Sequence, residues 1–293
     1  NGVIINYYIK KLQEDDYLRI DILNMDGSII RSFTNNQDKY SQAGNDDKSV
    51  MVGNPVLSNP NDIDSALGSD NIESLSPRNG GNRLIWDMRY PGFKSFEGMV
   101  LYSSPNVGPK VTPGKYNIKM TYNDFVFQEE FEIVKDPRVK ISQADYQDQL
   151  EFLIDVRDEV SKANQQIIDI RRIKNNMSFI LDKTKDNNEL QEMINKYLDD
   201  ISVVENNIHM TKNQSRQDPL NFGIRINNRI AFLLADSQRG DYPPTDQSKE
   251  FFSQVKEELN TEIINLRALI ERHSQKIEDY IKKNKIELIS LKD

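Results

Sequence analysis

The chain has 293 residues and a mass of 34.0 kDa, enough for one large domain or two of ordinary size. Hydrophobic residues make up 37% and charged residues 29% of it, which is too apolar for disorder throughout, and no run of about 18 apolar residues could cross a membrane. The 38 Lys and Arg against 46 Asp and Glu give a net charge of -8, and the lack of a basic cluster argues against nucleic acid or anionic lipid as the main partner. The absence of cysteine excludes disulfides and thiolate chemistry.

The first residues already form a strand-like run, Val3 to Ile9, and the sequence starts without an initiator Met. Because a folded protein rarely begins at a core strand, we expect the chain to be the C-terminal part of a longer one. A trimmed form of a complete protein is the alternative interpretation.

Residues 1–135 carry strand patterns and predict a β-sandwich of immunoglobulin-like type. Apolar and polar residues alternate over 17–23, and an Asp26-Gly27 turn leads into a second run over 28–33, which predicts a hairpin. Later strands are expected over 83–86, 115–122 and 125–134. In the last of these strands four apolar residues share one face: Phe125, Phe127, Phe131 and Ile133.

Two long loops are expected inside this half. Residues 35–81 are polar and rich in Asn, Asp and Ser, which indicates a surface insertion or a mobile excursion. The loop over 90–112 contains several glycines but keeps five apolar residues: Phe93, Phe96, Met99, Leu101 and Tyr102. Apolar side chains of that number need burial, so we expect this loop to pack down on other structure.

The pattern becomes helical after Asp136-Pro137, because a residue before proline is disfavoured in the helical region. Apolar residues then recur at spacings of three and four and predict four amphipathic helices, over about 142–181, 186–209, 218–239 and 245–280. Residues 136–293 are therefore predicted to form an antiparallel four-helix bundle with long first and last helices. The chain as a whole is predicted to be an α+β multidomain protein.

Three residues are candidates for a structural or functional role. His273 lies on the apolar seam of the last helix, and without a second histidine there we interpret it as a hydrogen-bonded structural residue rather than a metal ligand. His209, at a polar helix end, is expected to face solvent or to interact with the helix dipole. Trp86 could stack on carbohydrate, but a lone tryptophan in a strand favours the core anchor of a sandwich.

Charged groups give no sign of a reaction centre. A calcium site is not expected, because one acidic stretch has a spacing unlike that of an EF-hand loop: Asp62, Asp64, Asp70 and Glu73. The main basic group is expected to pair with acidic residues of neighbouring helices: Arg171, Arg172 and Lys174. The sequence contains no Gly-rich phosphate loop, no nucleophile elbow and no distinctive carboxylate pair, so we assign no catalytic residue, cofactor-binding residue or metal ligand.

Several short motifs in order along the chain resemble a FlgD-like immunoglobulin domain. They are Asn1–Lys10, Leu18–Leu23 with Asp26-Gly27 and Ile30-Arg31, Asn82–Pro91, and Pro113–Tyr116. The helical half is similar to the region C-terminal to that domain in large bacterial sortilin-like (VPS10-type) β-propeller proteins, often labelled BNR-repeat glycosyl hydrolases. There the matching stretches are Lys135–Arg138, Ile170–Arg172, Ile226–Ala231 and Pro243–Thr245.

The resemblance implies a C-terminal accessory region of a secreted or cell-envelope protein of the Bacteroidota, in an extracytoplasmic location. Its partners would be the upstream β-propeller of the same polypeptide and an envelope protein, with no nucleic acid, no membrane span and no cofactor. The Asp-box repeats of the propeller, of Ser-x-Asp-x-Gly-x-x-Trp type, do not occur in this sequence. Any glycosidase or binding activity that the family label suggests would lie upstream of Asn1, and no catalytic residue carries over onto this chain.

Two functions remain open. In the first, the chain is a non-catalytic structural and interaction module that braces a propeller and docks to an envelope partner. In the second, it is an accessory part of a carbohydrate-active enzyme and lines the substrate cleft with its long loops, for which Phe93 and Phe96 are the local candidates. Separately, Asp64-Ser65-Ala66 matches the short motif at which Bacteroidota attach O-glycans, which predicts a glycan on Ser65, with a chance match as the alternative.

Overall fold

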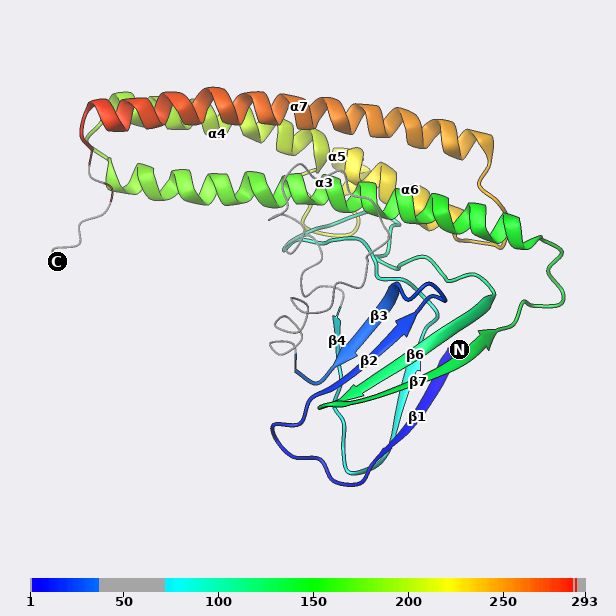
Figure 1. Ribbon diagram of the computed structural model, residues 1–293. Coiled ribbons are helices and arrows are strands. Elements are labelled where there is room, and N and C mark those ends of the chain that lie inside the picture. Colours follow the sequence, from blue (N-terminus) through cyan, green and yellow to red (C-terminus); the bar gives the residue numbers. More distant parts are fainter. Residues whose placement is uncertain (1, 37–71, 287, 289–293) are drawn as a thin grey trace. The chain divides into compact units, whose positions relative to one another are not determined.

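The structure is a computed structural model that describes residues 2–36, 72–286 and 288 (Figure 1). Strands make up its N-terminal part and helices come after them, which confirms the predicted α+β class. Most of the predicted insertion at 35–81 lies outside the described residues, and with it the predicted glycan acceptor Ser65.

The predicted strands all occur, and one more, β4 (Ile72–Ser74), joins them. The described strands are β1 (Val3–Ile9), β2 (Leu18–Leu23), β3 (Ile29–Thr34), β4 (Ile72–Ser74), β5 (Gly80–Trp86), β6 (Gly114–Tyr122) and β7 (Phe125–Ile133). The described helices are α3 (Gln143–Lys183), α4 (Asn188–Ile208), α5 (Pro219–Phe222), α6 (Ile226–Ser237) and α7 (Asp246–Lys283). None of these helices is long and apolar enough to span a bilayer.

The strands form two sheets that enclose one apolar core. β1 pairs antiparallel with β5, and the larger sheet has the order β4-β3-β2-β6-β7, in which only the β3–β4 pair is parallel. Ile5, Ile20 and Trp86, from both sheets, belong to one cluster of buried residues. Two sheets that share a core in this way make a β-sandwich, as the strand patterns predict.

The hairpin between β2 and β3 forms where its turn residues predict it. Gly27 has a φ of 86°, which glycine adopts without a steric penalty, and Asp26 Oδ1 accepts a hydrogen bond of 2.9 Å from the backbone N–H of Ser28. The register pairs Arg19 with Thr34. The alternation of apolar and polar residues in the sequence thus predicts which face of β2 enters the core.

The apolar face of β7 is covered at one end only. Phe131 and Ile133 are half-buried and pack against the sandwich core, whereas Phe125 and Phe127 on the same face are exposed. The opposing sheet has two strands against five, so it covers part of the larger sheet. Alternation in the sequence predicts the shared face correctly, but the extent of the cover depends on the other sheet.

The long first and last helices are present, but α4 and α6 follow one another along α7 (Figure 1). α3 has 41 residues and α7 has 38, while α4 has 21 and α6 has 12. Asp200 of α4 bonds to His273 in the C-terminal part of α7, and Arg229 of α6 bonds to Glu258 in its N-terminal part. Since each helical residue rises by about 1.5 Å, α4 and α6 together nearly match α7 in length. The helices therefore form three rods, one of them broken.

The break lies in the segment that the sequence presents as one helix from Asp218. Pro219 begins the four-residue α5, and Gly223 ends it with a φ of 85° and an N–H that donates to the carbonyl of Pro219. α6 then begins at Ile226. A glycine in the left-handed region is a common helix end. The apolar spacing from Phe222 to Ile226 continues across the break and hides it from a periodicity analysis.

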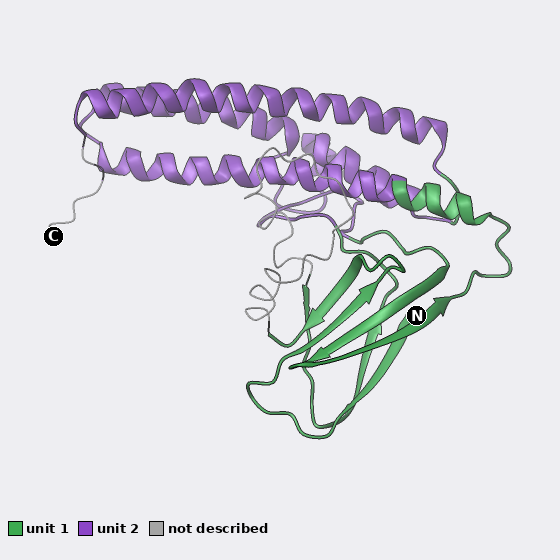
Figure 2. Ribbon diagram, in the orientation of Figure 1, with its two compact units in different colours: residues 1–92, 107–151, 241–243 green, residues 93–106, 152–240, 244–293 purple. Residues whose placement is uncertain are grey.

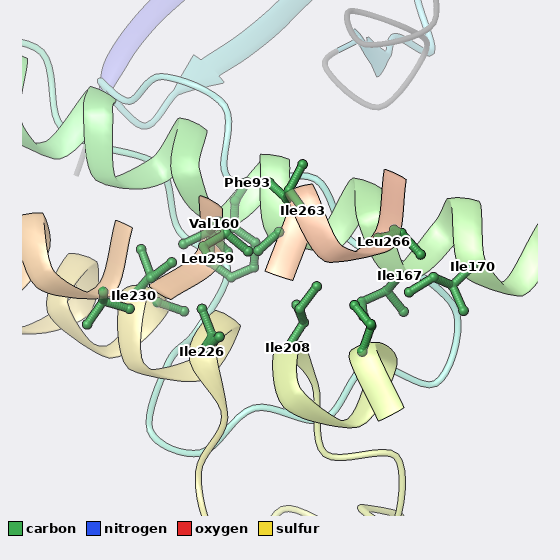
Figure 3. Packing of buried hydrophobic residues seen from close by; sticks show 14 of the residues in the cluster. Phe93, Val160, Ile167, Ile170, Ile208, Ile226, Ile230, Leu259, Ile263 and Leu266 are labelled. Carbon is green, nitrogen blue, oxygen red and sulfur yellow. The ribbon is translucent and has the colours of Figure 1, made fainter. Parts of the chain in front are cut away.

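The helices bury an apolar core of their own. Figure 3 shows how residues from α3, α6 and α7 meet there, among them Val160, Ile230 and Leu259. Phe93, which precedes the described helices in the chain, is 3% exposed and belongs to the same cluster. The helical core is therefore completed by a residue from the loop at 90–112, which confirms that this loop packs on other structure.

Two compact units result, and their bounds differ from the predicted division at residue 135 (Figure 2). Unit 1 comprises Asn1–Gly92, Val107–Glu151 and Asp241–Pro243, and unit 2 comprises Phe93–Asn106, Phe152–Gly240 and Pro244–Asp293. The difference arises because apolar side chains of residues 93–106 pack against the helices. We call residues 93–106 the inserted segment.

Candidate functional site

Metal-binding groups do not gather in the described part of the chain. No three His, Asp or Glu side chains within residues 2–36, 72–286 and 288 are placed to hold an ion. Of the acidic residues considered for calcium, Asp62, Asp64 and Asp70 lie outside the described residues, and Glu73 pairs with Arg31. The described residues thus provide no metal centre.

Trp86 lies in the core of the sandwich and is 1% exposed. Its ring meets Tyr116 and Phe131 edge to face, with centroid distances of 6.4 and 6.3 Å. Its Nε1 donates a 3.0 Å hydrogen bond to the carbonyl of Arg89. The indole has neither a free face nor a free N–H for a sugar, so the structure favours the core-anchor interpretation.

His273 is buried on the seam of α7, beside α4. Its ring stacks on Tyr197 with a centroid distance of 4.9 Å, and its Nε2 lies 2.8 Å from Oδ2 of Asp200. This hydrogen bond holds the pKa of Asp200 below its usual range. The residue therefore has the hydrogen-bonded structural environment that its seam position predicts.

His209 is buried, so the expectation of a solvent-facing ring was wrong. It follows α4 as the C-cap, and its ring meets Phe96 of the inserted segment edge to face at 4.9 Å. Its Nδ1 lies 3.2 Å from Nδ2 of Asn227. Burial lowers the pKa of His209 to about 4, so the ring is neutral at neutral pH and Nδ1 can accept from the amide. A neutral ring is also not the cationic dipole partner that a helix end would favour.

Three buried asparagines hold the inserted segment on the helices. Asn164 of α3 donates to the carbonyl of Lys94 at 2.7 Å. Asn228 of α6 accepts from the N–H of Tyr102 at 2.7 Å and donates to its carbonyl at 3.0 Å. Asn227 donates to Oδ1 of Asn164 at 3.0 Å. Since an unpaired amide in an apolar core is costly, these bonds define where the segment lies.

A buried carboxylate adds an ionic contact to this network. Glu205 of α4 is 4% exposed, and its two oxygens lie 3.1 Å from Arg171 Nε and 2.6 Å from Lys174 Nζ. These pairs confirm that the basic group of α3 contacts a neighbouring helix, whereas Arg172 pairs with Asp169 in its own helix. Glu205 is therefore neutralised by cations and is not poised as a general base.

Two aromatic residues of the inserted segment, Phe93 and Phe96, pack against the helices. Phe93 is in the helical core, and Phe96 has His209 at its edge and the guanidinium of Arg171 over its ring at 4.7 Å. Arg171 also donates to the carbonyl of Glu97 at 2.7 Å. A carbohydrate cleft needs aromatic faces open to solvent. The buried ring of Phe93 therefore cannot line such a cleft, whereas Phe96 is only half-buried and lines an open hollow of unit 2.

Two open hollows lie on the described surface. One of about 370 Å³ is on the five-stranded sheet, and its polar lining includes Arg19, Asp21, Asn117 and Lys119. Within it Asp21 is already bonded to Arg19 at 2.8 Å and to Ser32 at 2.6 Å. The other, of about 580 Å³, borders the inserted segment and is lined in part by Gly98, Arg171 and Asn175. Neither lining brings together a nucleophile with a base or a pair of free carboxylates.

Strand β7 carries three exposed large apolar side chains, more than any other described strand. It is the last strand of the five-stranded sheet and pairs with β6 alone. Phe125, Val126 and Phe127 are 67%, 57% and 56% exposed. Within the described chain no backbone hydrogen bond reaches β7 from outside its sheet. We call Phe125–Ile133 the β7 edge.

Comparison with known proteins adds no assignment, since no family model, no curated protein and no solved structure matches this chain. Function is therefore inferred from its own geometry.

The sequence pattern did not predict the buried polar network. Asn227 and Asn228 are visible as two consecutive amides in an apolar run, but the partner Tyr102 lies 126 positions from Asn228.

Proposed function

We propose that this chain is a non-catalytic structural and interaction module, the C-terminal part of a larger secreted or cell-envelope protein with a β-propeller upstream. The order of motifs that resembles sortilin-like propeller proteins supports this context. The exposed β7 edge supports a docking role and is the observation that carries the proposal. The propeller of the same polypeptide or an envelope protein would cover it.

The β7 edge has two features that favour contact with another protein. Burial of apolar surface contributes about 25 cal/mol per Å², so covering Phe125, Val126 and Phe127 would favour association. An outer strand also presents backbone donors and acceptors that can pair with a further chain. Isolated apolar side chains on a surface are ordinary, but three consecutive ones on an outer strand favour an interface.

The buried polar groups support the non-catalytic part of the proposal. Glu205 is engaged by two cations, and His209 is enclosed by Phe96 and Asn227. His209 contacts the inserted segment directly, and Glu205 is linked to it through Arg171, which donates to the carbonyl of Glu97. The carbohydrate-enzyme alternative is weaker, because Phe93 is buried and Phe96, with Arg171 over its ring, is half-buried.

The upstream coding sequence tests the context. It should encode repeated Asp-box motifs of Ser-x-Asp-x-Gly-x-x-Trp type before residue 1. An upstream region that lacks them would contradict the assignment as the C-terminal part of a propeller protein.

Enzyme assays test the absence of catalysis. The purified chain should release no more chromophore from a panel of aryl glycosides than a heat-denatured sample, and Glu205→Gln should behave like the wild type. Turnover that disappears in Glu205→Gln would show that this carboxylate is catalytic.

Docking is tested with the propeller produced as a separate protein. We expect the two to bind, and Phe127→Ser to weaken binding at least fivefold. Ile85→Ser is the matched control, since Ile85 is 57% exposed on β5 of the other sheet. Equal loss in both variants would show that the β7 edge is not the docking surface for the propeller.

A further inference from the structure

We infer that the β7 edge binds an extended segment of another protein as an added strand, and that this segment is apolar at one end and basic at the other. The inference rests on the proposed docking role and specifies the chemistry of the partner.

The backbone of β7 is suited to strand addition along its whole length. Its nine residues pair with β6 from Phe125 opposite Tyr122 to Ile133 opposite Gly114. In an antiparallel pair, successive residues point their N–H and C=O groups alternately toward the partner strand and away from it. The outward groups of β7 receive no backbone partner from the described residues. An extended segment would satisfy them by main-chain hydrogen bonds.

Side chains divide the β7 edge into an apolar end and an acidic end. The apolar end contains the exposed residues Phe125, Val126 and Phe127. The acidic end contains three exposed glutamates, Glu129, Glu130 and Glu132, and β7 has no Lys or Arg. Side chains directly opposite each other on neighbouring strands interact most strongly. The segment that fits is therefore apolar beside 125–127 and carries Lys or Arg beside 129–132.

The apolar end continues a face that already exists within the sheet. Phe125 lies opposite Tyr122 and Phe127 opposite Met120, and both β6 residues are half-buried members of the sandwich core. On the outer side of β7 no further described strand covers this face, and Phe125 and Phe127 are exposed there. Apolar residues of an added strand would extend the face by one more strand.

The three glutamates of the acidic end outnumber the one described lysine that contacts them. Lys115 of β6 pairs with Glu130 at 2.7 Å and lies opposite Glu132, so one cation serves two carboxylates, and Glu129 forms no ion pair with another described residue. Basic side chains opposite these glutamates would be complementary in charge, which raises the association rate and excludes acidic segments.

Charge also disfavours a second copy of this chain as the occupant. An antiparallel pair of β7 strands about a two-fold axis at Glu129 would place that residue opposite its own copy, and Gln128 opposite Glu130. The three glutamates of each copy would then crowd along one seam, in a dimer of chains that each carry a net charge of -8. Like charges directly opposite on strands are destabilising.

The test uses the full chain and two synthetic peptides of about nine residues, the length of β7. The first alternates Val and Thr in one half and Val and Lys in the other, and the second has Glu in place of each Lys. Amide hydrogen exchange followed by NMR should show slower exchange, by tenfold or more, at alternate residues of β7 when the Lys peptide is bound. The Glu peptide should bind at least tenfold more weakly. Absence of protection in β7 at saturating Lys peptide would overturn the inference.

Two variants identify the side chains responsible. Phe127→Ser should weaken the Lys peptide at least fivefold, and Glu132→Lys should weaken it while strengthening the Glu peptide. Ile85→Ser should leave both affinities unchanged, and thermal melts of all three variants check that each is folded. Affinity that is the same in Glu132→Lys and wild type would remove the basic partner from the inference.

Two further outcomes separate this inference from the docking role. If the separately produced propeller binds through Phe127 but leaves the β7 amides unprotected, the docking role stands and strand addition is wrong. If sedimentation shows a dimer that Phe127→Ser abolishes, with no peptide protection, the occupant is a second copy and the inference is overturned.

Discussion

The indole of Trp86 connects the two sheets of the sandwich, since it extends from β5 and meets Tyr116 of β6 and Phe131 of β7. Trp86→Ala should therefore lower the free energy of unfolding by about 3–5 kcal/mol, the usual cost of a large core truncation. Denaturation followed by near-ultraviolet circular dichroism measures this loss. Trp86→Phe should cost less, because an aromatic ring remains between the sheets.

An unchanged melting temperature in Trp86→Ala, together with lost affinity for an oligosaccharide, would contradict the core assignment. The carbohydrate alternative would then regain its best candidate.

His209 should make the helical unit sensitive to mild acid. Its pKa is about 4 in the folded chain against 6.5 for an ordinary histidine, because burial disfavours the charged ring. The unfolded chain therefore binds the proton first as pH falls. The stability that the neutral ring contributes is fully present above about pH 6.5 and is lost as pH falls toward 4, by about 3 kcal/mol in all.

Urea denaturation of unit 2 between pH 7 and pH 4.5 measures this dependence. His209→Gln, which cannot titrate, should lose less stability over that range than the wild type. Equal slopes in the two proteins would show that another group is responsible.

At the scale of elements, the inserted segment depends on a few amides of α3 and α6. Asn228→Ala removes both bonds to Tyr102 and one to Ser104, and leaves buried backbone groups unpaired. We expect a loss of about 1–3 kcal/mol and faster exchange of the Tyr102 amide. Asn176→Ala, an exposed asparagine in α3, should change neither quantity. Unchanged exchange of Tyr102 in Asn228→Ala would mean that apolar packing alone holds the segment.

Local signals predict the elements that depend on neighbours in sequence. The Asp26-Gly27 turn, the hydroxyl of Ser142 that accepts from the Asp145 N–H before α3, and the Thr245 cap of α7 all follow from residue type. The sequence did not predict the surroundings of residues whose partners lie far away in the chain. The ring of His209 is buried because Phe96 covers it, and no periodicity reveals a contact across more than 100 residues.

The same dependence on distant parts of the chain explains why the sequence did not predict the candidate site. Alternation along β7 predicts that Phe125 and Phe131 share a face, but only the width of the opposing sheet decides that one is exposed and the other covered. The β7 edge therefore could not be recognised as a surface from the sequence alone. The positions of the strands and of the long helices along the chain, by contrast, can be predicted from periodicity because each buries an extended apolar face.

At the scale of the whole molecule, the interleaved units predict the outcome of dividing the chain. A piece comprising 136–293 contains every helix that the structure describes but lacks the inserted segment and therefore Phe93. Its helical core should melt roughly 5–15 °C below that of the full chain. Losing a buried Phe costs about 3–5 kcal/mol, and each kcal/mol lowers the melting temperature of a domain of this size by a few degrees. Calorimetry of both proteins measures the difference.

A fusion that joins residues 93–106 to the same piece through a Gly/Ser linker should recover most of the loss. A piece 136–293 that melts like the full chain would show that the helices do not need the segment.

The order in which the chain is synthesised gives the inserted segment a further consequence. Phe93 leaves the ribosome before any of the described helices, while its core neighbours Leu259 and Ile263 belong to the last of them. At translation rates of about 5–20 residues per second, roughly 10–40 s separate Phe93 from the end of α7. The sandwich can close as soon as β7 emerges, but the segment must wait with an apolar ring uncovered until the final helix arrives. This interval is when the nascent chain most needs a chaperone.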